Sequence, residues 1–152
     1  MIISNKKGFT LIEAVASIFI IASVLAVGIT ILMNIRIQGI STQRRILAVE
    51  VGSLIRDDII TSASYDEVAL WLDGSEKILN STNCQTSGSP FSCDSFLYTL
   101  DGISYDENVV ITFLAPTIQS EEYHIIHFSV VIEYYSLKTI ELEGILYDET
   151  IQ

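Results

Sequence analysis

The clearest pattern in the chain is an apolar run from Phe9 to Met33 that contains a single charged residue, Glu13. As a helix rising about 1.5 Å per residue, a run of about 25 residues crosses the roughly 30 Å hydrocarbon core of a bilayer. The run therefore predicts a transmembrane helix over residues 9–33. Because a carboxylate near the bilayer centre costs on the order of 2 to 3 kcal/mol, Glu13 should lie near the interface or have a cationic partner.

Apolar residues recur at helical spacing after this run, which predicts an amphipathic continuation of the helix over residues 34–63. The expected apolar stripe consists of Ile40, Leu47, Val51, Leu54 and Ile55. Gly39 and Gly52 weigh against a helix here, since each costs about 1 kcal/mol relative to Ala in a helix interior. The stripe is expected to carry a globular head over residues 64–152.

A second, short helix is predicted from Val68 to Leu72. Ser64 and Glu67 have the spacing of a capping box, and Gly74 follows the apolar residues as a stop signal. Trp71 lies on this helix and is interpreted as a core residue in preference to a binding residue.

The C-terminal half alternates apolar and polar residues with the period of two that predicts strands. The expected strands are Phe96–Leu100 and Ile103–Tyr105, joined by the hairpin signal Asp101-Gly102, then Val109–Leu114, Tyr123–Tyr135 and Lys138–Tyr147. In the last two strands, Phe128, Val130, Ile132 and Tyr134 share one face, as do Ile140, Leu142 and Leu146, with Glu141 and Glu143 opposite. The predicted fold is α+β, with a long N-terminal helix packed against an antiparallel meander of about four strands.

Residues 77–95 are polar and rich in Ser, Thr and Asn, which predicts a surface loop. Cys84 and Cys93 lie in this loop and are the two cysteines of the chain. A disulfide is the simplest interpretation outside the membrane, and closing this short loop would contribute about 2.5 to 3 kcal/mol in the chain-entropy model. Two free thiols or a metal-binding pair remain as alternatives.

The stretch before the apolar run has a specific order of residues, KKGFTLIE from Lys6 to Glu13. It resembles the N-terminus of type IV pilins and pseudopilins, whose class III signal peptide ends in basic residues and a glycine. The resemblance implies that residues 1–8 are a leader, with Lys6 and Lys7 as its basic residues. It also implies that prepilin peptidase cuts after Gly8 and N-methylates Phe9.

The resemblance assigns a partner to Glu13 as well. The matching glutamate of the family is thought to pair with the N-terminal amine of a neighbouring subunit, and methylation leaves that amine protonatable. The resemblance further implies assembly with other pilin subunits on an inner-membrane platform with its ATPase. It favours a minor pilin or pseudopilin and does not distinguish pilus biogenesis, type II secretion and DNA uptake.

Charge divides sharply along the chain. Residues 1–56 carry six basic and two acidic groups, a net charge of +4, whereas residues 57–152 carry two and seventeen, a net charge of −15. Lys6 and Lys7 before the apolar run predict a cytoplasmic N-terminus and a head outside the cytoplasmic membrane. The resemblance to pilins implies that the head lies in a surface or periplasmic filament after assembly. The acidic head is not expected to bind nucleic acid by itself, since phosphates are neutralised by Lys and Arg.

Residues suited to catalysis or metal binding are few. His124 and His127 are three apart, which places them on opposite faces of a strand and argues against a shared metal. The acids Asp101, Asp106, Glu107, Glu121 and Glu122 lie at expected strand ends. Their spacing matches no calcium loop, and calcium binding by these acids remains as an alternative. No phosphate loop or nucleophile motif is present, so neither enzymatic activity nor a cofactor is expected.

Two other interpretations of the N-terminus remain for comparison. An ordinary secretory signal fails, because the apolar run continues past the small residues Ala14, Val15 and Ala16. A generic single-pass anchor is an alternative, although it assigns no role to the Gly8-Phe9 junction or to Glu13. The main alternative function is a membrane-tethered extracellular binding or sensor domain that does not polymerise.

Overall fold

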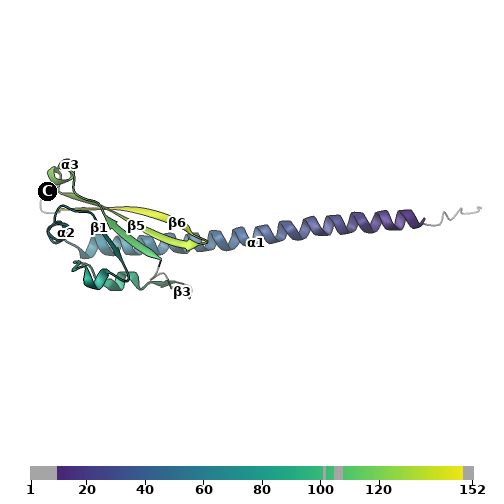
Figure 1. The fold of residues 1–152 in the computed structure, drawn as a ribbon, viewed down its shortest axis with the longest axis horizontal. Helices are drawn as coiled ribbons and strands as arrows, with labels where there is room; N and C mark the ends of the chain where they lie inside the picture. The colour runs from purple at the N-terminus through teal and green to yellow at the C-terminus, as the bar shows by residue number, and fades with distance from the viewer. Residues whose placement is uncertain (1–9, 101, 105–107, 149–152) are drawn as a thin grey trace, which may run out of the picture. The chain divides into compact units, whose positions relative to one another are not determined.

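The structure, a computed structural model, describes residues 10–100, 102–104 and 108–148. The chain divides into two compact units, Met1–Ser41 and Thr42–Gln152. In the first unit the described residues belong almost wholly to helix α1, which extends from Leu11 to Ser62. The second unit contains the end of α1 and all the other elements, and Figure 1 shows their order along the chain.

The buried face of α1 differs in part from the predicted stripe. Val51 and Ile55 are fully buried as expected, but Ile40 and Leu54 are 49% and 43% exposed, so these two assignments were wrong. The buried residues of α1 are Ala48, Val51, Gly52, Ile55 and Ile59. Two of them are small residues, which let the helix backbone approach the sheet closely. The prediction considered only large apolar residues and therefore placed the stripe too far to one side.

The predicted α+β architecture is confirmed. Four antiparallel strands lie in the order β1-β4-β5-β6, with α1 packed on one face. Their bounds are β1 Lys77–Asn80, β4 Val109–Phe113, β5 Ile125–Tyr135 and β6 Lys138–Tyr147. β5 and β6 form the long hairpin that the alternation predicted, joined by Ser136 and Leu137 at φ 46° and 63°. Positive φ at both loop positions gives the turn a twist that suits the flanking strands.

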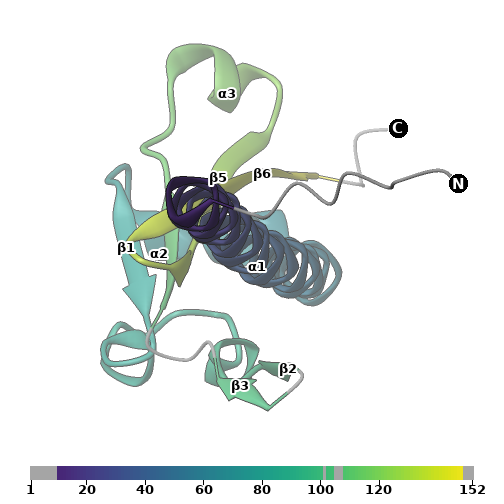
Figure 2. The ribbon, with the colours of Figure 1, turned by 90° about the vertical axis from the view of Figure 1, so that its right-hand side faces the viewer.

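The edge strand at one side of the sheet was predicted incorrectly. Lys77–Asn80 was expected in a loop, yet it pairs with β4 as the edge strand β1. The predicted hairpin around Gly102 does form, from β2 (Thr99–Leu100) and β3 (Ile103–Ser104), but as a separate two-stranded sheet (Figure 2). β1 has only Leu79 as a buried apolar residue in its polar surroundings, so the local pattern did not reveal it.

The β2–β3 hairpin begins later in the chain than predicted. Phe96, expected to begin a strand, ends the 3-10 helix η2 (Cys93–Phe96) and is buried in the core. Tyr105, expected to end the second strand, lies outside the described residues. The side chain of Phe96 therefore contributes to the core from a turn of helix, where period-two alternation does not apply.

Two short helices flank the sheet. α2 (Tyr65–Leu72) begins at the predicted cap, where the Ser64 hydroxyl accepts the Glu67 N–H at 3.3 Å. α3 (Ile118–Glu122) was not predicted, and β5 consequently begins at Ile125 instead of Tyr123. Its capping box joins Thr117 to Ser120. The usual residue at the second position of a capping box is Glu or Gln, so a serine there did not signal a helix.

The core of the head is built around aromatic side chains. Phe113 stacks on Phe91 and Phe128 with ring centroids 4.9 and 5.4 Å apart. Trp71 packs edge-on against Phe113, and its indole N–H donates to the Ser87 carbonyl at 3.0 Å. Trp71 therefore packs as part of the core, as the sequence predicted. Lys77 covers the outer face of this indole, 4.7 Å from the ring centroid.

The polar segment after β1 is closed by the predicted disulfide between Cys84 and Cys93, whose Cα atoms are 5.8 Å apart. This segment contains the 3-10 helix η1 (Cys84–Thr86). The bond holds the segment that contains Phe91 and the Ser87 carbonyl, which are the contacts that pack it onto Trp71. A segment with the composition of a surface loop thereby becomes part of the core.

Candidate assembly helix

The first part of α1 presents exposed apolar side chains along its length. Leu11, Ile12 and Phe19 are 85%, 77% and 74% exposed, and large apolar residues remain more than half exposed as far as Ile37. In length and composition the helix is able to cross a membrane. Side chains of this kind require an apolar environment, which lipid or other apolar helices can supply.

The hydroxyl groups in this part of α1 are satisfied by the helix itself. Ser17, Ser23 and Thr30 donate to the carbonyl oxygens four residues earlier, at 2.7 to 2.9 Å. An unpaired hydroxyl in an apolar medium is costly, and these bonds remove that cost without a partner. No role was predicted for these three residues, although hydroxyl groups spaced through an apolar run are a recognisable signal in a sequence.

Glu13 lies in the first turn of α1 and is exposed. It is the only ionisable residue between Leu11 and Ile35. The positive end of the helix dipole favours a carboxylate in the first turn, but it does not neutralise a full charge in an apolar environment. The helix therefore places one acid, Glu13, within an apolar surface. Lys6, Lys7, Gly8 and Phe9 of the predicted processing site lie outside the described residues.

The comparisons with known proteins bear on this segment. Residues 3–32 match the prokaryotic N-terminal methylation motif. The match supports the class III signal of type IV pilins and pseudopilins that the KKGFTLIE stretch suggested. No curated protein and no solved structure gave a significant match to the chain.

The motif also indicates the general class of the protein. It points to a structural, pilin-like protein, and it implies processing by prepilin peptidase and assembly with other pilins. Together with the apolar helix, it suggests anchoring in a membrane. The matched residues include residues 3–8 of the expected leader and the first part of α1, and none of the head.

The other residues considered for catalysis or metal binding do not come together in one site. His127 is exposed on β5, and His124, just before that strand, has its ring 5.5 Å from that of Tyr65. Glu121 and Glu122 lie on α3, whereas Asp101, Asp106 and Glu107 are outside the described residues. Within the described part of the chain, no three His, Cys, Asp or Glu side chains are grouped to hold a metal ion.

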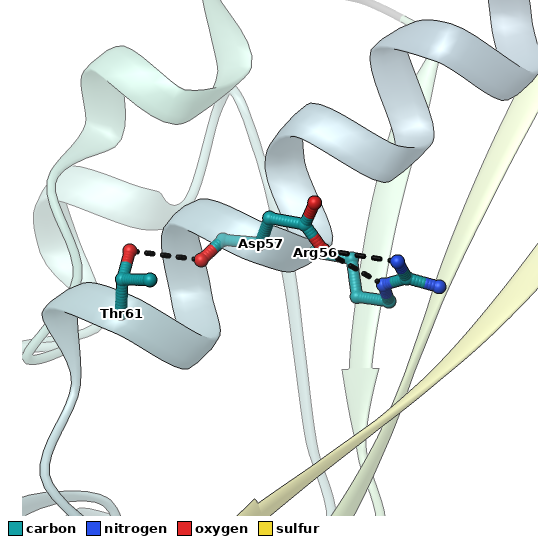
Figure 3. A network of polar contacts seen from close by, with 3 residues as sticks. All are labelled: Arg56, Asp57 and Thr61. Atoms are coloured by element: carbon teal, nitrogen blue, oxygen red, sulfur yellow. Dashed lines mark hydrogen bonds and ion pairs between the residues drawn. The ribbon is translucent and has the colours of Figure 1, made fainter.

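A polar network near the end of α1 is drawn in Figure 3. Arg56 donates to Asp57 through two nitrogens at 3.0 and 3.1 Å, and the Thr61 hydroxyl donates to the Asp57 carbonyl at 2.8 Å. The Asp57 side chain is 62% exposed. Exposed pairs of this kind contribute about 0 to 1 kcal/mol, so the network is a solvated surface feature.

A cavity of about 360 Å³ lies where α1 meets α2, beside the end of β6. Tyr65 and Tyr147 line it together with Asp66 and Asp148. Burial raises the pKa of the Tyr65 hydroxyl, and the nearby charges of Glu121, Asp66 and Asp148 raise it further. The surroundings of the cavity are therefore acidic.

Proposed function

We propose that this chain is a structural subunit, a minor pilin or pseudopilin, of a type IV pilus-like filament. The observation that carries the proposal is the methylation motif at residues 3–32 leading into an exposed apolar helix with one acid, Glu13, in its first turn. A generic anchor would need only the apolar helix. The motif and the acid together fit a helix that is processed and then packed against other helices.

Processing begins the proposed sequence of events. Prepilin peptidase cuts after Gly8, and the new N-terminus, Phe9, is N-methylated. Lys6 and Lys7 hold the leader on the cytoplasmic side, so that the acidic head lies outside. Removing the leader removes Lys6 and Lys7 and leaves an α-ammonium group on Phe9, four residues before Glu13 in the sequence.

Assembly then moves the apolar part of α1 from lipid into the filament. Its exposed residues, from Leu11 to Ile37, pack against the helices of neighbouring subunits on an inner-membrane platform with its ATPase. Glu13 pairs with the Phe9 amine of a neighbour. An unpaired ion in an apolar core has a desolvation cost of several kcal/mol, so pairing selects one axial register over the others.

The test combines processing and location. Filaments sheared from cells, and the membranes left behind, are analysed by intact-mass measurement for this chain. The proposal expects a chain that begins at N-methylated Phe9 in both fractions. Finding residues 1–8 still attached in a host with the peptidase, or finding no chain in any filament, would instead favour a tethered binding or sensor domain. The variant Gly8→Val provides the control, because a bulky side chain at the cleavage site blocks cutting.

A further inference from the structure

The cavity at the junction of α1, α2 and the end of β6, which we call the junction cavity, combines three kinds of side chain in its lining. Ile60, Ala63 and Leu146 contribute aliphatic groups, and Leu146 is buried. Tyr65 and Tyr147 add two phenol rings. The third kind is acidic. At about 360 Å³ the cavity has room for a small ligand, since ligand sites begin at roughly 300 Å³.

The charged side chains in this lining are all acidic. Asp66 and Asp148 line the cavity, and no lysine, arginine or histidine is among its lining residues in the described part of the chain. Besides burial, the charges of Glu121, Asp66 and Asp148 raise the pKa of the Tyr65 hydroxyl. The potential in and around the cavity is therefore negative, and it favours a cation over an anion.

The end of α1 adds to this negative potential. Residues 60–62 at the end of the helix line the cavity, and its last turn contains no basic residue. A helix end of this kind has carbonyl groups without intrahelical partners and favours cations. The positive start of α2 is already satisfied, because the Ser64 hydroxyl accepts the Glu67 N–H and Asp66 and Glu67 lie in the first turn.

His124 connects the two acidic and aromatic borders of the cavity. Its ring centroid lies 5.5 Å from that of Tyr65 at the start of α2. Its backbone carbonyl accepts the N–H of Asp148, just after β6, at 3.2 Å. Tyr65 and Asp148, which come from distant parts of the sequence, are therefore held on either side of one residue.

The lining suits an organic cation better than a metal ion. A metal ion needs several oxygen or nitrogen ligands at short distance, and in the residues that the structure describes no three His, Cys, Asp or Glu side chains are grouped to hold one. The face of a phenol ring attracts an ammonium group, and an aliphatic wall accepts the methylene groups that carry it. Both features lie beside the carboxylates of Asp66 and Asp148.

We propose that the junction cavity binds a primary alkylammonium group, whose charge meets Asp66 and Asp148 and whose methylene stem packs against the tyrosine rings and the aliphatic wall. A lysine side chain of a partner protein and a free diamine share this chemistry. The inference goes beyond the proposed function, because the cavity uses no residue of the methylation motif or of the apolar run.

Nuclear magnetic resonance of the full-length chain in nonionic detergent tests the binding. The tyrosine rings are isotope-labelled, and n-butylammonium is added as the probe. Saturable shifts are expected for Tyr65 and Tyr147 and not for Tyr98, which does not line the cavity. Butanol has the same stem without the charge and should bind at least about tenfold more weakly, because it makes no charge-assisted hydrogen bond.

Variants of the lining identify the groups that bind. Asp66→Asn with Asp148→Asn should weaken n-butylammonium binding by about tenfold or more. Asp73→Asn with Asp94→Asn makes the same change of charge at exposed positions outside the cavity and should change the affinity by less than about twofold, since salt screens distant charges. Tyr147→Leu keeps an apolar side chain without the ring and should weaken binding by about two- to fivefold. Thermal unfolding of each variant checks that the head is folded.

Three results would overturn the inference: equal binding of butanol, unchanged affinity when both Asp66 and Asp148 are Asn, or tyrosine shifts with calcium chloride and none with n-butylammonium. Two more probes distinguish the sources of the ligand. Tighter binding of Nα-acetyl-lysine N-methylamide than of putrescine points to a lysine side chain of a partner protein, and the reverse order points to a free diamine. Either order supports the site. All of these measurements use the isolated chain, so their outcome is independent of whether the chain enters filaments.

Discussion

At the scale of single residues, Glu13 carries the strongest prediction. Glu13→Gln should leave membrane insertion intact, because losing a charge eases entry into lipid. Incorporation into filaments should fall by at least about tenfold, because the Phe9 amine of a neighbour then has no counter-charge in an apolar core. The measurement is the ratio of chain in sheared filaments to chain in membranes. Ser17→Ala is the matched control, since it removes a polar group one turn away whose only assigned role is its bond to the Glu13 carbonyl. Equal ratios for Glu13→Gln and wild type would contradict the pairing.

Gly144 carries a second prediction at this scale. It lies opposite Phe128 on β5, and a Cβ added there would come within 2.1 Å of the buried phenyl ring. Gly144→Ala should therefore destabilise the head by about 1 to 3 kcal/mol, the usual cost of overpacking a core. Urea unfolding followed by circular dichroism measures it. Gly39→Ala, which meets no atom within 4 Å, should leave the midpoint of the head unchanged, and an unchanged midpoint for Gly144→Ala would show that the ring moves aside freely.

At the scale of elements, the disulfide determines whether the segment after β1 stays on the core. Replacing Cys84 and Cys93 by Ser should lower the free energy of unfolding by about 2.5 to 3 kcal/mol, because the unfolded chain then gains conformational entropy. The freed segment should also loosen the bond from the Trp71 indole to the Ser87 carbonyl, which shifts the tryptophan emission. Unfolding midpoints and fluorescence test both effects. Rapid thiol labelling of the folded wild-type protein would show instead that the cysteines are not bonded.

At the scale of the whole molecule, the acidic head should lose stability at high pH through its tyrosines. Burial raises the pKa of Tyr65 and of Tyr98 above the ordinary value of 10.0, with smaller contributions from acids, Glu121 first for Tyr65 and Asp58 for Tyr98. The folded state then holds these protons more tightly than the unfolded state. The resulting stability is complete below pH 10 and is lost as the pH rises through the folded pKa values.

Unfolding free energy measured across this alkaline range tests the sign. It should decline above pH 10 for wild type, and the decline should be shallower for Tyr65→Phe with Tyr98→Phe. Tyr147→Phe is a control that retains both shifted groups. A decline of equal slope in all three proteins would mean that the two hydroxyls are not the source.

The sequence by itself determined those features whose cause is local. One continuous stretch of sequence contains the apolar run, the motif before it and the lone acid. The helix, the class III signal and the unusual position of Glu13 could therefore be recognised from the sequence. The β5–β6 hairpin and the cap at Ser64 are also set by neighbouring residues. The disulfide was predictable because the chain has only two cysteines, close together in the sequence.

The tertiary structure alone decided what depends on distant partners. Lys77–Asn80 is a strand because β4, about thirty residues later, supplies its hydrogen bonds, and nothing in its own four residues requires one. Gly52 and Gly144 are needed because Leu142 and Phe128 occupy the space that a Cβ would fill. Val110, Val131 and Glu141 lie in one row across the sheet only because β4, β5 and β6 pair in this register. Such non-local pairings bring together residues that a local pattern treats separately, and this is the physical reason that the sequence did not reveal them.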